Sequence, residues 1–452
     1  MKIGLIAMSG IRVRNEELLQ LGLTLPGFVE RGKVIASLPS LGLLTLAGLT
    51  PTDHEVSYLE IADLKLTLLQ DDLPQDFDLV AISSFSAQID EAYELADRFR
   101  SRGTMVVLGG LHVTSLPDEA QEHCDAVVVG EGEPHWPQLL KDAQNGALKA
   151  RYDFVVPEFK LADAPMPAFE LLEISKYNRL TVQTTRGCPH KCEFCASSIL
   201  LTKKYKLKPV EKVLAEIDKI KELWQYPFIE FADDNSFVNP AYWKRLLPEL
   251  RKRRIHWFTE TDISVAFNDE LLRLMRRAGC AQVLIGLESP TSEALRGIDA
   301  RNWKYKQAPQ YIEAVRRIQS HGISVNGCLV VGLDGHDSSI FDKIYRFVEL
   351  SGQHQVQITL PTAFPGTPFY HRLKNEGRLI DETDWRKCTL FDLNIVPARM
   401  TGEELVEGFK GLVTTLYDAA HTSARERAFK KCMRDGYRAR RVSACTERHV
   451  AS

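Results

Sequence analysis

The chain has 452 residues, of which 44% are hydrophobic and 26% are charged, a composition typical of a folded protein with sizeable cores. The 57 lysines and arginines nearly balance the 60 aspartates and glutamates, so the sequence gives no support for a nucleic-acid partner. The length predicts two or three domains. The first residues lack the apolar core of a signal peptide, and no apolar stretch is long enough for a transmembrane segment, so we expect a cytoplasmic protein.

The first 150 residues or so alternate short apolar runs with helical spacing. Buried strands are expected at residues 2–8, 78–85, 104–110 and 125–133, and a helix at 87–103. This alternation predicts an α/β unit with a parallel, doubly wound (Rossmann-like) sheet. Gly109, Gly110, Gly130 and Gly132 follow its strands, where such sheets bind ligands and a glycine allows close approach to the backbone. The same glycines would also suit tight turns, and the sequence leaves both interpretations open.

A second series of strands and helices begins at Leu180. Its six expected strands lie at residues 179–187, 228–236, 255–264, 281–289, 324–335 and 354–361. Six repeats are fewer than the eight of a closed barrel, so a partial (β/α)6 TIM barrel is predicted. Polar residues at the strand ends would line its chemical face or cap the following helices: Asp233, Asp234, Asp262, Ser264, Glu288, Ser289 and Asp334.

These patterns divide the chain into four parts. We expect a Rossmann-like domain at residues 1–150, a linker at 151–179 that contains prolines and shows weak periodicity, and the partial barrel at 180–370. Residues 371–452 are charged and are expected to form a helical region, to which we assign no chemistry.

Three cysteines stand within eight residues in the stretch TTRGCPHKCEFCASS, with the spacing C-x3-C-x2-C. The chain has nine cysteines, an odd number mostly scattered singly, so metal binding is favoured over a disulfide framework. Cys188, Cys192 and Cys195 can each hold one iron of a [4Fe–4S] cluster. The fourth iron then lacks a protein ligand, and an open position is where a substrate or cofactor binds.

Two other roles for these cysteines were weighed. Zinc bound by the three cysteines and His190 is less favoured, because zinc ligands usually come in separated pairs and the chain has no second C-x2-C. A redox dithiol of Cys192 and Cys195 would leave Cys188 unexplained.

The cysteine spacing after the first strand of a partial barrel resembles the signature of radical S-adenosylmethionine (SAM) enzymes. More narrowly, the chain resembles the subgroup with an N-terminal cobalamin (B12)-binding-type domain, which includes hopanoid methylases and the anaerobic magnesium-protoporphyrin cyclase. In the first half the resemblance rests on LPSLGLLTLAGLTP, VVLGGLHVTSLPDEA and DAVVVGEGEPHWPQLLKD. In the second half it rests on the cysteine stretch, FADDNSF, VLIGLESP, GLDGHD and PTAFPGTPFYHRLKNEGRL.

The resemblance implies that the open iron binds the amino and carboxylate groups of SAM, and that the reduced cluster breaks a C–S bond. It implies a small-molecule substrate and an electron donor such as a flavodoxin or ferredoxin. Phe194 matches the family's aromatic residue near the adenine, and Asp233 and Asp234 match the motif that contacts the amino group. Ser264 and Glu288 stand where polar strand ends contact the carboxylate and ribose.

Cobalamin is the second cofactor that the resemblance implies, although the D-x-H-x-x-G motif that supplies a histidine to cobalt is absent from the sequence. A bound cobalamin would therefore lack a protein histidine ligand. It would lie over the first domain's strand ends, at Ser83, Ser84, Gly109, Gly110, Gly130 and Glu131. The alternative is a vestigial domain that only shapes the substrate pocket.

The leading functional hypothesis is cobalamin-dependent methylation of an unactivated carbon or phosphorus in a biosynthetic pathway. A second hypothesis uses the same oxygen-sensitive cluster without methyl transfer, for cyclisation, ring contraction or transfer of the aminocarboxypropyl arm of SAM. A third, from another class, is a non-catalytic iron–sulfur or zinc-binding protein, which would leave the acidic residues of the barrel face unused.

Overall fold

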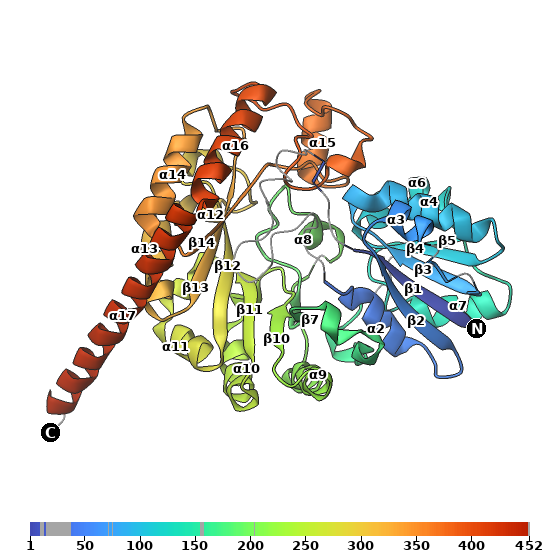
Figure 1. The fold of residues 1–452 in the computed structure, drawn as a ribbon, viewed down its shortest axis with the longest axis horizontal. Helices are drawn as coiled ribbons and strands as arrows, with labels where there is room; N and C mark the ends of the chain where they lie inside the picture. Colours follow the sequence, from blue (N-terminus) through green and yellow to red (C-terminus); the bar gives the residue numbers. More distant parts are fainter. Residues whose placement is uncertain are drawn as a thin grey trace.

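The computed structural model describes residues 1–9, 13–14, 38–70, 72–74, 76–153, 158–202 and 204–450, with side chains up to residue 441. Two six-stranded sheets lie side by side, and the cysteine stretch with α8 (Ala196–Leu200) lies between them (Figure 1). No helix among the described residues is long and apolar enough to cross a membrane.

The first sheet is entirely parallel, with the order β2-β1-β3-β4-β5-β6. Its strands are β1 (Lys2–Met8), β2 (Glu55–Ile61), β3 (Leu79–Ser83), β4 (Met105–Gly109), β5 (Ala126–Val128) and β6 (Arg151–Tyr152). The edge strands β2 and β6 were not predicted. The flanking helices are α2 (Leu41–Leu49), α3 (Leu64–Leu69), α4 (Ile89–Arg100), α5 (Leu111–Ser115), α6 (Pro117–Gln121) and α7 (Trp136–Gln144).

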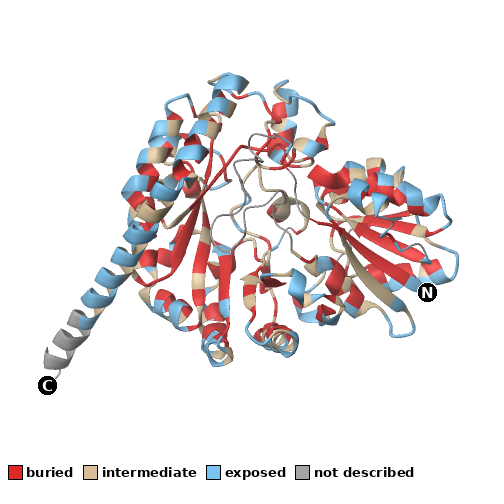
Figure 2. Cartoon of the chain, in the orientation of Figure 1, coloured by how far each residue is buried: buried red, intermediate tan, exposed pale blue. Residues whose placement is uncertain are grey.

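Both faces of this sheet are buried, as the near-continuous apolar strands require (Figure 2). Alternate residues along β1 enter different cores: Ile6 and Met8 pack on one face, and Leu5 and Ala7 on the other. This arrangement confirms the doubly wound sheet predicted for the first part of the chain.

The second sheet contains the six predicted strands in the order β14-β13-β12-β11-β10-β7, all parallel. They are β7 (Leu180–Val182), β10 (Phe228–Phe231), β11 (His256–Thr261), β12 (Cys280–Glu288), β13 (Ser324–Val330) and β14 (Gln355–Thr359). The strands β7 and β14 form its two ends, so the partial barrel is confirmed. The outer helices are α9 (Val210–Leu223), α10 (Pro240–Arg253), α11 (Asp269–Arg277), α12 (Trp303–Gln307), α13 (Tyr311–Ser320) and α14 (Ile340–Ser351).

The stretch 179–187, predicted as one strand, is interrupted. The strand β7 ends at Val182, and the short β8 (Thr185–Arg186) pairs in antiparallel fashion with β9 (Lys206–Leu207). The chain turns because Asp233, at the end of the neighbouring β10, accepts hydrogen bonds from the backbone N–H groups of Thr184 and Thr185.

The predicted linker is packed rather than free. It forms three 3-10 turns, at Leu161–Asp163, Phe169–Leu171 and Ile174–Lys176, and buries Leu161 and Phe169 almost completely. The domain limits at residues 150, 180 and 370 stay predictions.

The C-terminal region is helical at α15 (Pro368–Asn375), α16 (Gly402–Tyr417) and α17 (Ala419–Val450). The helix α15 and the segment between it and α16 pack against the first sheet, where Phe369, Trp385 and Ile395 join the core on one of its faces. The indole N–H of Trp385 donates to Glu119 at 3.2 Å. The C-terminal region therefore connects the two units, while α17 packs along α13 of the barrel and its far end projects beyond it (Figure 1).

Candidate functional site

The three cysteines of the C-x3-C-x2-C stretch follow β8 and lie at the carboxyl end of the barrel strands. All three thiols are free and partly buried. Burial raises the pKa of Cys192 to about 12 and also raises the pKa values of Cys188 and Cys195. Bound iron reverses this preference, since a metal ion deprotonates the thiols that ligate it.

Among the described residues, no three His, Cys, Asp or Glu side chains gather closely enough to hold a single metal ion. A cube of four irons has a different requirement, because each thiolate binds its own iron. The donor set of the loop, three soft thiolates on one short segment, therefore fits a [4Fe–4S] cluster.

Asp233 is buried, and its carboxylate already holds four hydrogen bonds. The backbone N–H groups of Thr184 and Thr185 each donate to Oδ1 at 2.8 Å, and the hydroxyls of Thr184 and Ser236 donate to Oδ2. These bonds occupy the roughly four acceptor positions of a carboxylate. Asp233 therefore shapes the turn before the cysteines, and its predicted contact with the SAM amino group stays a prediction.

Asp234 bonds to both ends of the cysteine stretch. Its Oδ2 accepts from the N–H of Gly187 at 2.6 Å, and its Oδ1 accepts from the hydroxyl of Ser197 in α8. Gly187 has a φ of 90°, and an added Cβ would lie 2.9 Å from the carbonyl oxygen of Lys204. Asp234 therefore fixes the start of the cysteine stretch relative to α8.

His190, in the middle of the cysteine stretch, bonds to a residue from another strand end. Its Nε2 lies 2.9 Å from Oδ2 of Asp262, and its ring lies over Trp303 at 4.3 Å. Burial opposes the charge on Asp262, but hydrogen bonds from His190, Ser264 and Asn235 outweigh it and lower its pKa to about 2. His190 therefore acts as an anchor of the loop in this arrangement. Ser264, predicted to contact SAM, donates its backbone N–H to Asp262 at 2.8 Å.

Glu288 ends β12 with a φ of 61°, a conformation that costs energy for a residue other than glycine. Its Oε1 accepts a hydrogen bond from Nζ of the buried Lys304 at 2.9 Å, and the same ammonium donates to the carbonyl oxygen of Gly286 at 2.7 Å. Strained residues gather at functional sites, which agrees with the predicted role of Glu288 at the SAM site. Lys304 was not predicted.

Glu260, also missed in the sequence, lies on β11 near Glu288. Trp257 and Thr259 point from β11 into the layer of outer helices, so the alternation of the strand turns Glu260 toward the inside of the barrel. Its side chain is open to solvent there. Although it is open to solvent, the carboxyl is surrounded by the barrel wall, and this desolvation, together with the charges of Glu230, Asp234, Asp233 and Glu288, raises the pKa of Glu260 to about 8.

The C-terminal region holds the cysteine stretch from the opposite side. Arg372 of α15 donates to both carboxylate oxygens of Glu193, at 2.8 and 3.2 Å, and to Asp334 at 2.8 Å. Phe194, the next residue, packs against the cores of both units. No local pattern indicates this contact, because Arg372 and Glu193 are 179 residues apart.

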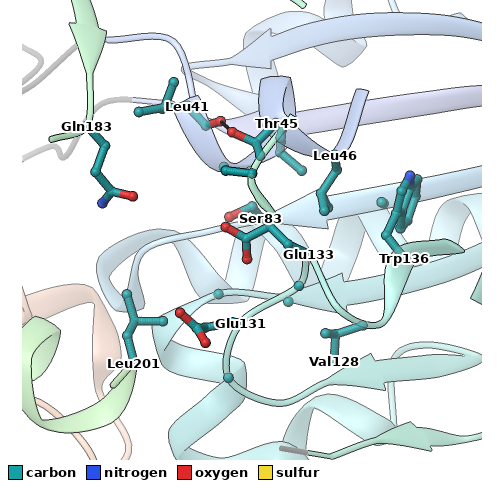
Figure 3. Close-up of a pocket in the computed structure, with 18 of the residues that line it drawn as sticks. Leu41, Thr45, Leu46, Ser83, Val128, Glu131, Glu133, Trp136, Gln183 and Leu201 are labelled. Carbon is teal, nitrogen blue, oxygen red and sulfur yellow. Dashed lines mark hydrogen bonds between the residues drawn. The ribbon is translucent and has the colours of Figure 1, made fainter. Parts of the chain in front are cut away.

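A cavity of about 300 Å³ opens at the carboxyl ends of the first sheet's strands (Figure 3). Five of the six residues predicted for cobalamin line it: Ser83, Gly109, Gly110, Gly130 and Glu131. The sixth, Ser84, does not line it, and its hydroxyl donates to the backbone oxygen of Phe85 at 2.9 Å. Leucines of α2, together with Val128 and Trp136, make much of the wall apolar. The helix α2 was not predicted as part of this site.

The glycines give this cavity its space. A Cβ added at Gly109 would meet nothing nearer than 3.8 Å, so the strand end leaves room for a ligand against the backbone. Gly110 and Gly130 have φ values of 110° and 85°, which other residues rarely adopt. None of the described lining residues is a histidine. His112 is bonded to Ser86 and Glu119 instead, each at 3.0 Å.

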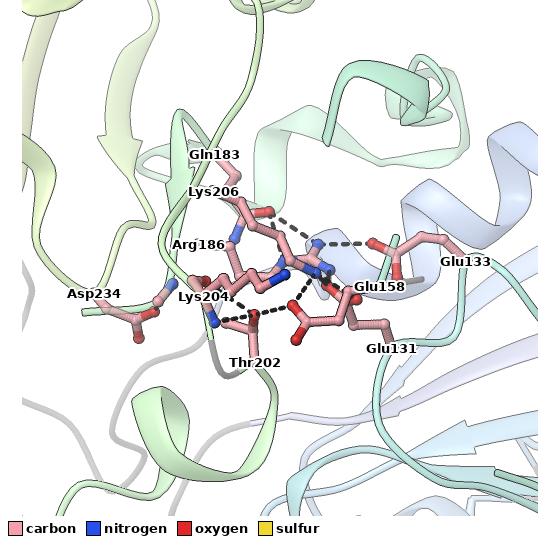
Figure 4. A network of polar contacts seen from close by, with 10 residues as sticks. Glu131, Glu133, Glu158, Gln183, Arg186, Thr202, Lys204, Lys206 and Asp234 are labelled. Atoms are coloured by element: carbon pink, nitrogen blue, oxygen red, sulfur yellow. Dashed lines mark hydrogen bonds and ion pairs between the residues drawn. The ribbon is translucent and has the colours of Figure 1, made fainter. Parts of the chain in front are cut away.

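The barrel unit supplies the rest of this cavity wall. Gln183, Arg186, Leu201, Lys208 and Ala232 line it, and Gln183 and Arg186 immediately precede the cysteines. Arg186 and Lys206 form a network of ion pairs with Glu131 and Glu133 of the first unit (Figure 4). The glycine-lined cavity and the cysteine stretch are therefore parts of one site between the two units.

Family models match three parts of the chain: the radical SAM superfamily at residues 182–348, the B12-binding domain at 31–140, and a domain of unknown function, DUF4070, at 367–450. The chain is 30% identical over 361 residues to the hopanoid C-2 methylase of Rhodopseudomonas palustris, covering 77% of this chain and 67% of that protein. It is 29% identical over 405 residues to the bacteriochlorophyllide d C-12(1)-methyltransferase of Chlorobaculum tepidum, covering 86% and 84%.

The fold is similar to a solved structure over nearly its whole length. The radical SAM methyltransferase TsrM from Kitasatospora setae, with cobalamin and a [4Fe–4S] cluster bound, aligns with a TM-score of 0.66 and 15% identity, covering 97% of this chain and 99% of that one. The protein therefore belongs to the radical SAM superfamily and carries an N-terminal B12-binding domain, and its cofactors are a [4Fe–4S] cluster, SAM and cobalamin.

Proposed function

We propose that this enzyme methylates an unactivated carbon or phosphorus of a small-molecule substrate, with SAM as the source of the methyl group and cobalamin as its carrier. One observation carries the proposal: residues of both units line a single cavity, and two of those from the barrel, Gln183 and Arg186, lie within five residues before Cys188. A cobalamin in this cavity would lie next to SAM on the cluster. The named relatives that methylate hopanoids and bacteriochlorophyllide support the same reaction class.

In this proposal Cys188, Cys192 and Cys195 hold three irons and leave the fourth for SAM. When bound, the cofactors would supply the chemistry: reductive cleavage of one SAM would give methionine and 5′-deoxyadenosine, whose added hydrogen comes from the substrate, and cobalamin would carry the methyl group of a second SAM to the position that lost it. The protein orients the reacting groups and excludes water. A small redox protein such as a flavodoxin or ferredoxin would supply the electrons.

The other side chains of the site position these groups. Asp234 and Asp262 hold the cysteine stretch from the barrel, and Arg372 holds it from α15. Glu288, on its strained backbone, would contact the ribose or carboxylate of SAM, and Phe194 would pack near the adenine. The apolar wall formed by α2 and Trp136 would cover the cobalamin and exclude water from it.

Product analysis tests this proposal. Protein reconstituted anaerobically with iron, sulfide and hydroxocobalamin is incubated with SAM and a chemical reductant. S-adenosylhomocysteine together with 5′-deoxyadenosine would support methylation. 5′-Deoxyadenosine alone would instead indicate cyclisation or ring contraction, and methylthioadenosine would indicate aminocarboxypropyl transfer. The absence of all three products would contradict every radical mechanism.

A further inference from the structure

The hairpin that leads into the cysteine stretch contacts the B12-binding unit through one arginine. Nη1 of Arg186 lies 2.7 Å from Oε1 of Glu131, and Nη2 lies 2.7 Å from Oε1 of Glu133. Both glutamates belong to the loop after β5 of the first sheet. Nε and Nη2 of Arg186 also donate to the side-chain oxygen of Gln183, at 3.2 and 3.0 Å. One guanidinium thus spans the boundary between the units.

The second strand of the hairpin strengthens this contact. Nζ of Lys206 lies 2.8 and 2.7 Å from the two carboxylate oxygens of Glu131 and 3.5 Å from Glu158 (Figure 4). The side chains of Arg186, Lys206, Glu131 and Glu133 are only 8–14% exposed. Burial opposes the charge on Glu133, but attraction to Arg186 outweighs it and lowers the pKa of its carboxyl. Buried charges require such pairing, so removal of either partner is costly.

These residues also form part of the cavity wall. Arg186, Gln183, Glu131 and Glu133 all line the glycine-lined cavity. On the other side, only Gly187 separates Arg186 from Cys188, and Asp234 holds the N–H of Gly187. The ion pairs of Arg186 therefore connect the cavity wall at Glu131 and Glu133 directly to the start of the cysteine stretch.

We propose that Arg186 is a positioning residue that sets the distance between the cobalamin cavity and the SAM-binding cluster by bonding Glu131 and Glu133 at the same time. The inference rests on the proposed function and adds a residue to it. A lysine would keep the charge but not the planar fork that reaches two carboxylates. A positive charge alone is thus insufficient to hold both glutamates, and the test addresses the planar guanidinium group of Arg186.

The test compares Arg186→Lys, Arg186→Met and Glu133→Gln with a control, Arg253→Met. Arg253 makes a two-point ion pair with Asp218 between α10 and α9, on the outside of the barrel. Each reconstituted protein is assayed for iron, for hydroxocobalamin affinity by equilibrium dialysis, and for the ratio of S-adenosylhomocysteine to 5′-deoxyadenosine. Neither product requires the natural substrate to be known.

For Arg186→Lys we expect unchanged iron, hydroxocobalamin binding weaker by about tenfold, and a product ratio lower by about tenfold. 5′-Deoxyadenosine should stay within about twofold of wild type, because the cluster still cleaves SAM. Arg186→Met should show a larger loss of hydroxocobalamin affinity and a lower product ratio than Arg186→Lys. Glu133→Gln should show the same pattern as Arg186→Lys. The control should match wild type. A role in folding alone would lower both products equally, so a constant ratio overturns the inference.

An unchanged hydroxocobalamin affinity in the Arg186 and Glu133 variants would also overturn the inference that Arg186 positions the two sites. If the Arg186 variants lose iron, the Glu133→Gln variant tests the inference in their place. Among the hydrogen bonds of the described residues, Glu133 reaches the cysteine stretch only through Arg186. The double variant Arg186→Met/Glu133→Gln should be no worse than Arg186→Met alone, and additive losses would contradict a shared role. Wild-type protein that bound no hydroxocobalamin would instead refute the proposed function, and the inference with it.

Discussion

The cysteine stretch and the glycine-lined cavity are neighbours, but the chain builds them in opposite ways. The cysteine stretch is defined by side chains: three thiols, held by Asp234, Asp262 and Arg372 from three separate segments. The cavity is defined by missing side chains, at glycines where strands end. A substitution should therefore damage the first site by removing atoms and the second by adding them.

The largest effect is expected from Cys192→Ala. Loss of one of three ligands should abolish the cluster and reduce both SAM-derived products by more than about 100-fold, because the cluster is held by only three thiolates. Iron analysis and the broad absorbance near about 400 nm measure the loss. Cys432→Ala, in α17, is the matched control and should keep its cluster. Retained iron in Cys192→Ala would contradict the assignment.

A larger side chain in the cavity should have the converse effect: loss of hydroxocobalamin binding with retention of the cluster. Gly109 lines the cavity, and an added Cβ there would meet nothing nearer than 3.8 Å, so the side chain of Gly109→Leu would extend into the ligand space. We expect hydroxocobalamin binding to fall by about 100-fold or more, while the cluster still forms 5′-deoxyadenosine. Gly411→Leu, at an exposed position of α16 where an added Cβ would meet nothing within 4 Å, serves as the control for replacing a glycine by leucine. Loss of iron in Gly109→Leu would mean that the two sites are not separable.

The contrast also explains what the sequence could predict. The cysteines and the six barrel strands were predicted because spacing and apolar periodicity are local signals. The contacts of Arg186, Lys304 and Arg372 were not, because their partners lie 16 to 179 residues away and a charged residue carries no period. The edge strands β2 and β6 were missed for a related reason: β2 is only partly buried, and β6 has two residues.

Asp233 shows how a correct motif leaves a role undecided. The sequence placed it at a strand end beside the cysteines, which is where it lies. Its four hydrogen bonds to the turn and to Ser236 depend on where other backbone groups point, and this cannot be read from a pattern of residue types. Positions of functional residues were thus more predictable than their partners.

A moderate effect is expected where the side-chain scaffold of the cysteine stretch is weakened. Asp262→Asn removes a charge-assisted bond to His190 and should lower the free energy of unfolding of the metal-free protein by about 1–3 kcal/mol at neutral pH. Since the pKa of Asp262 is lowered to about 2, its stabilisation is present above its ordinary pKa and is lost as the pH falls toward 2. Chemical denaturation at pH 7 and pH 3 should show the difference from wild type shrinking. A constant difference would contradict this account.

The smallest effect concerns Glu260, where the sign of the pH dependence is opposite. Its pKa is raised to about 8, so between its ordinary value and pH 8 the folded state holds a proton that the unfolded state has lost. Stability therefore falls as the pH rises through this range and levels off above it. Glu260→Gln removes the titration, so its melting temperature should exceed that of wild type by an amount that grows from pH 5 to pH 8.

Thermal melts of metal-free protein at pH 5, 6, 7, 8 and 9 measure this difference, and Glu349→Gln, on an exposed face of α14, controls for the loss of a surface carboxylate. The expected difference is a few degrees at most, because Glu260 is open to solvent inside the barrel and water screens its neighbours. A difference independent of pH would show that Glu260 titrates normally. A growing difference would show that the barrel disfavours the charged carboxylate of Glu260, through desolvation and through the neighbouring carboxylates, and a cation such as the sulfonium of SAM would relieve this effect.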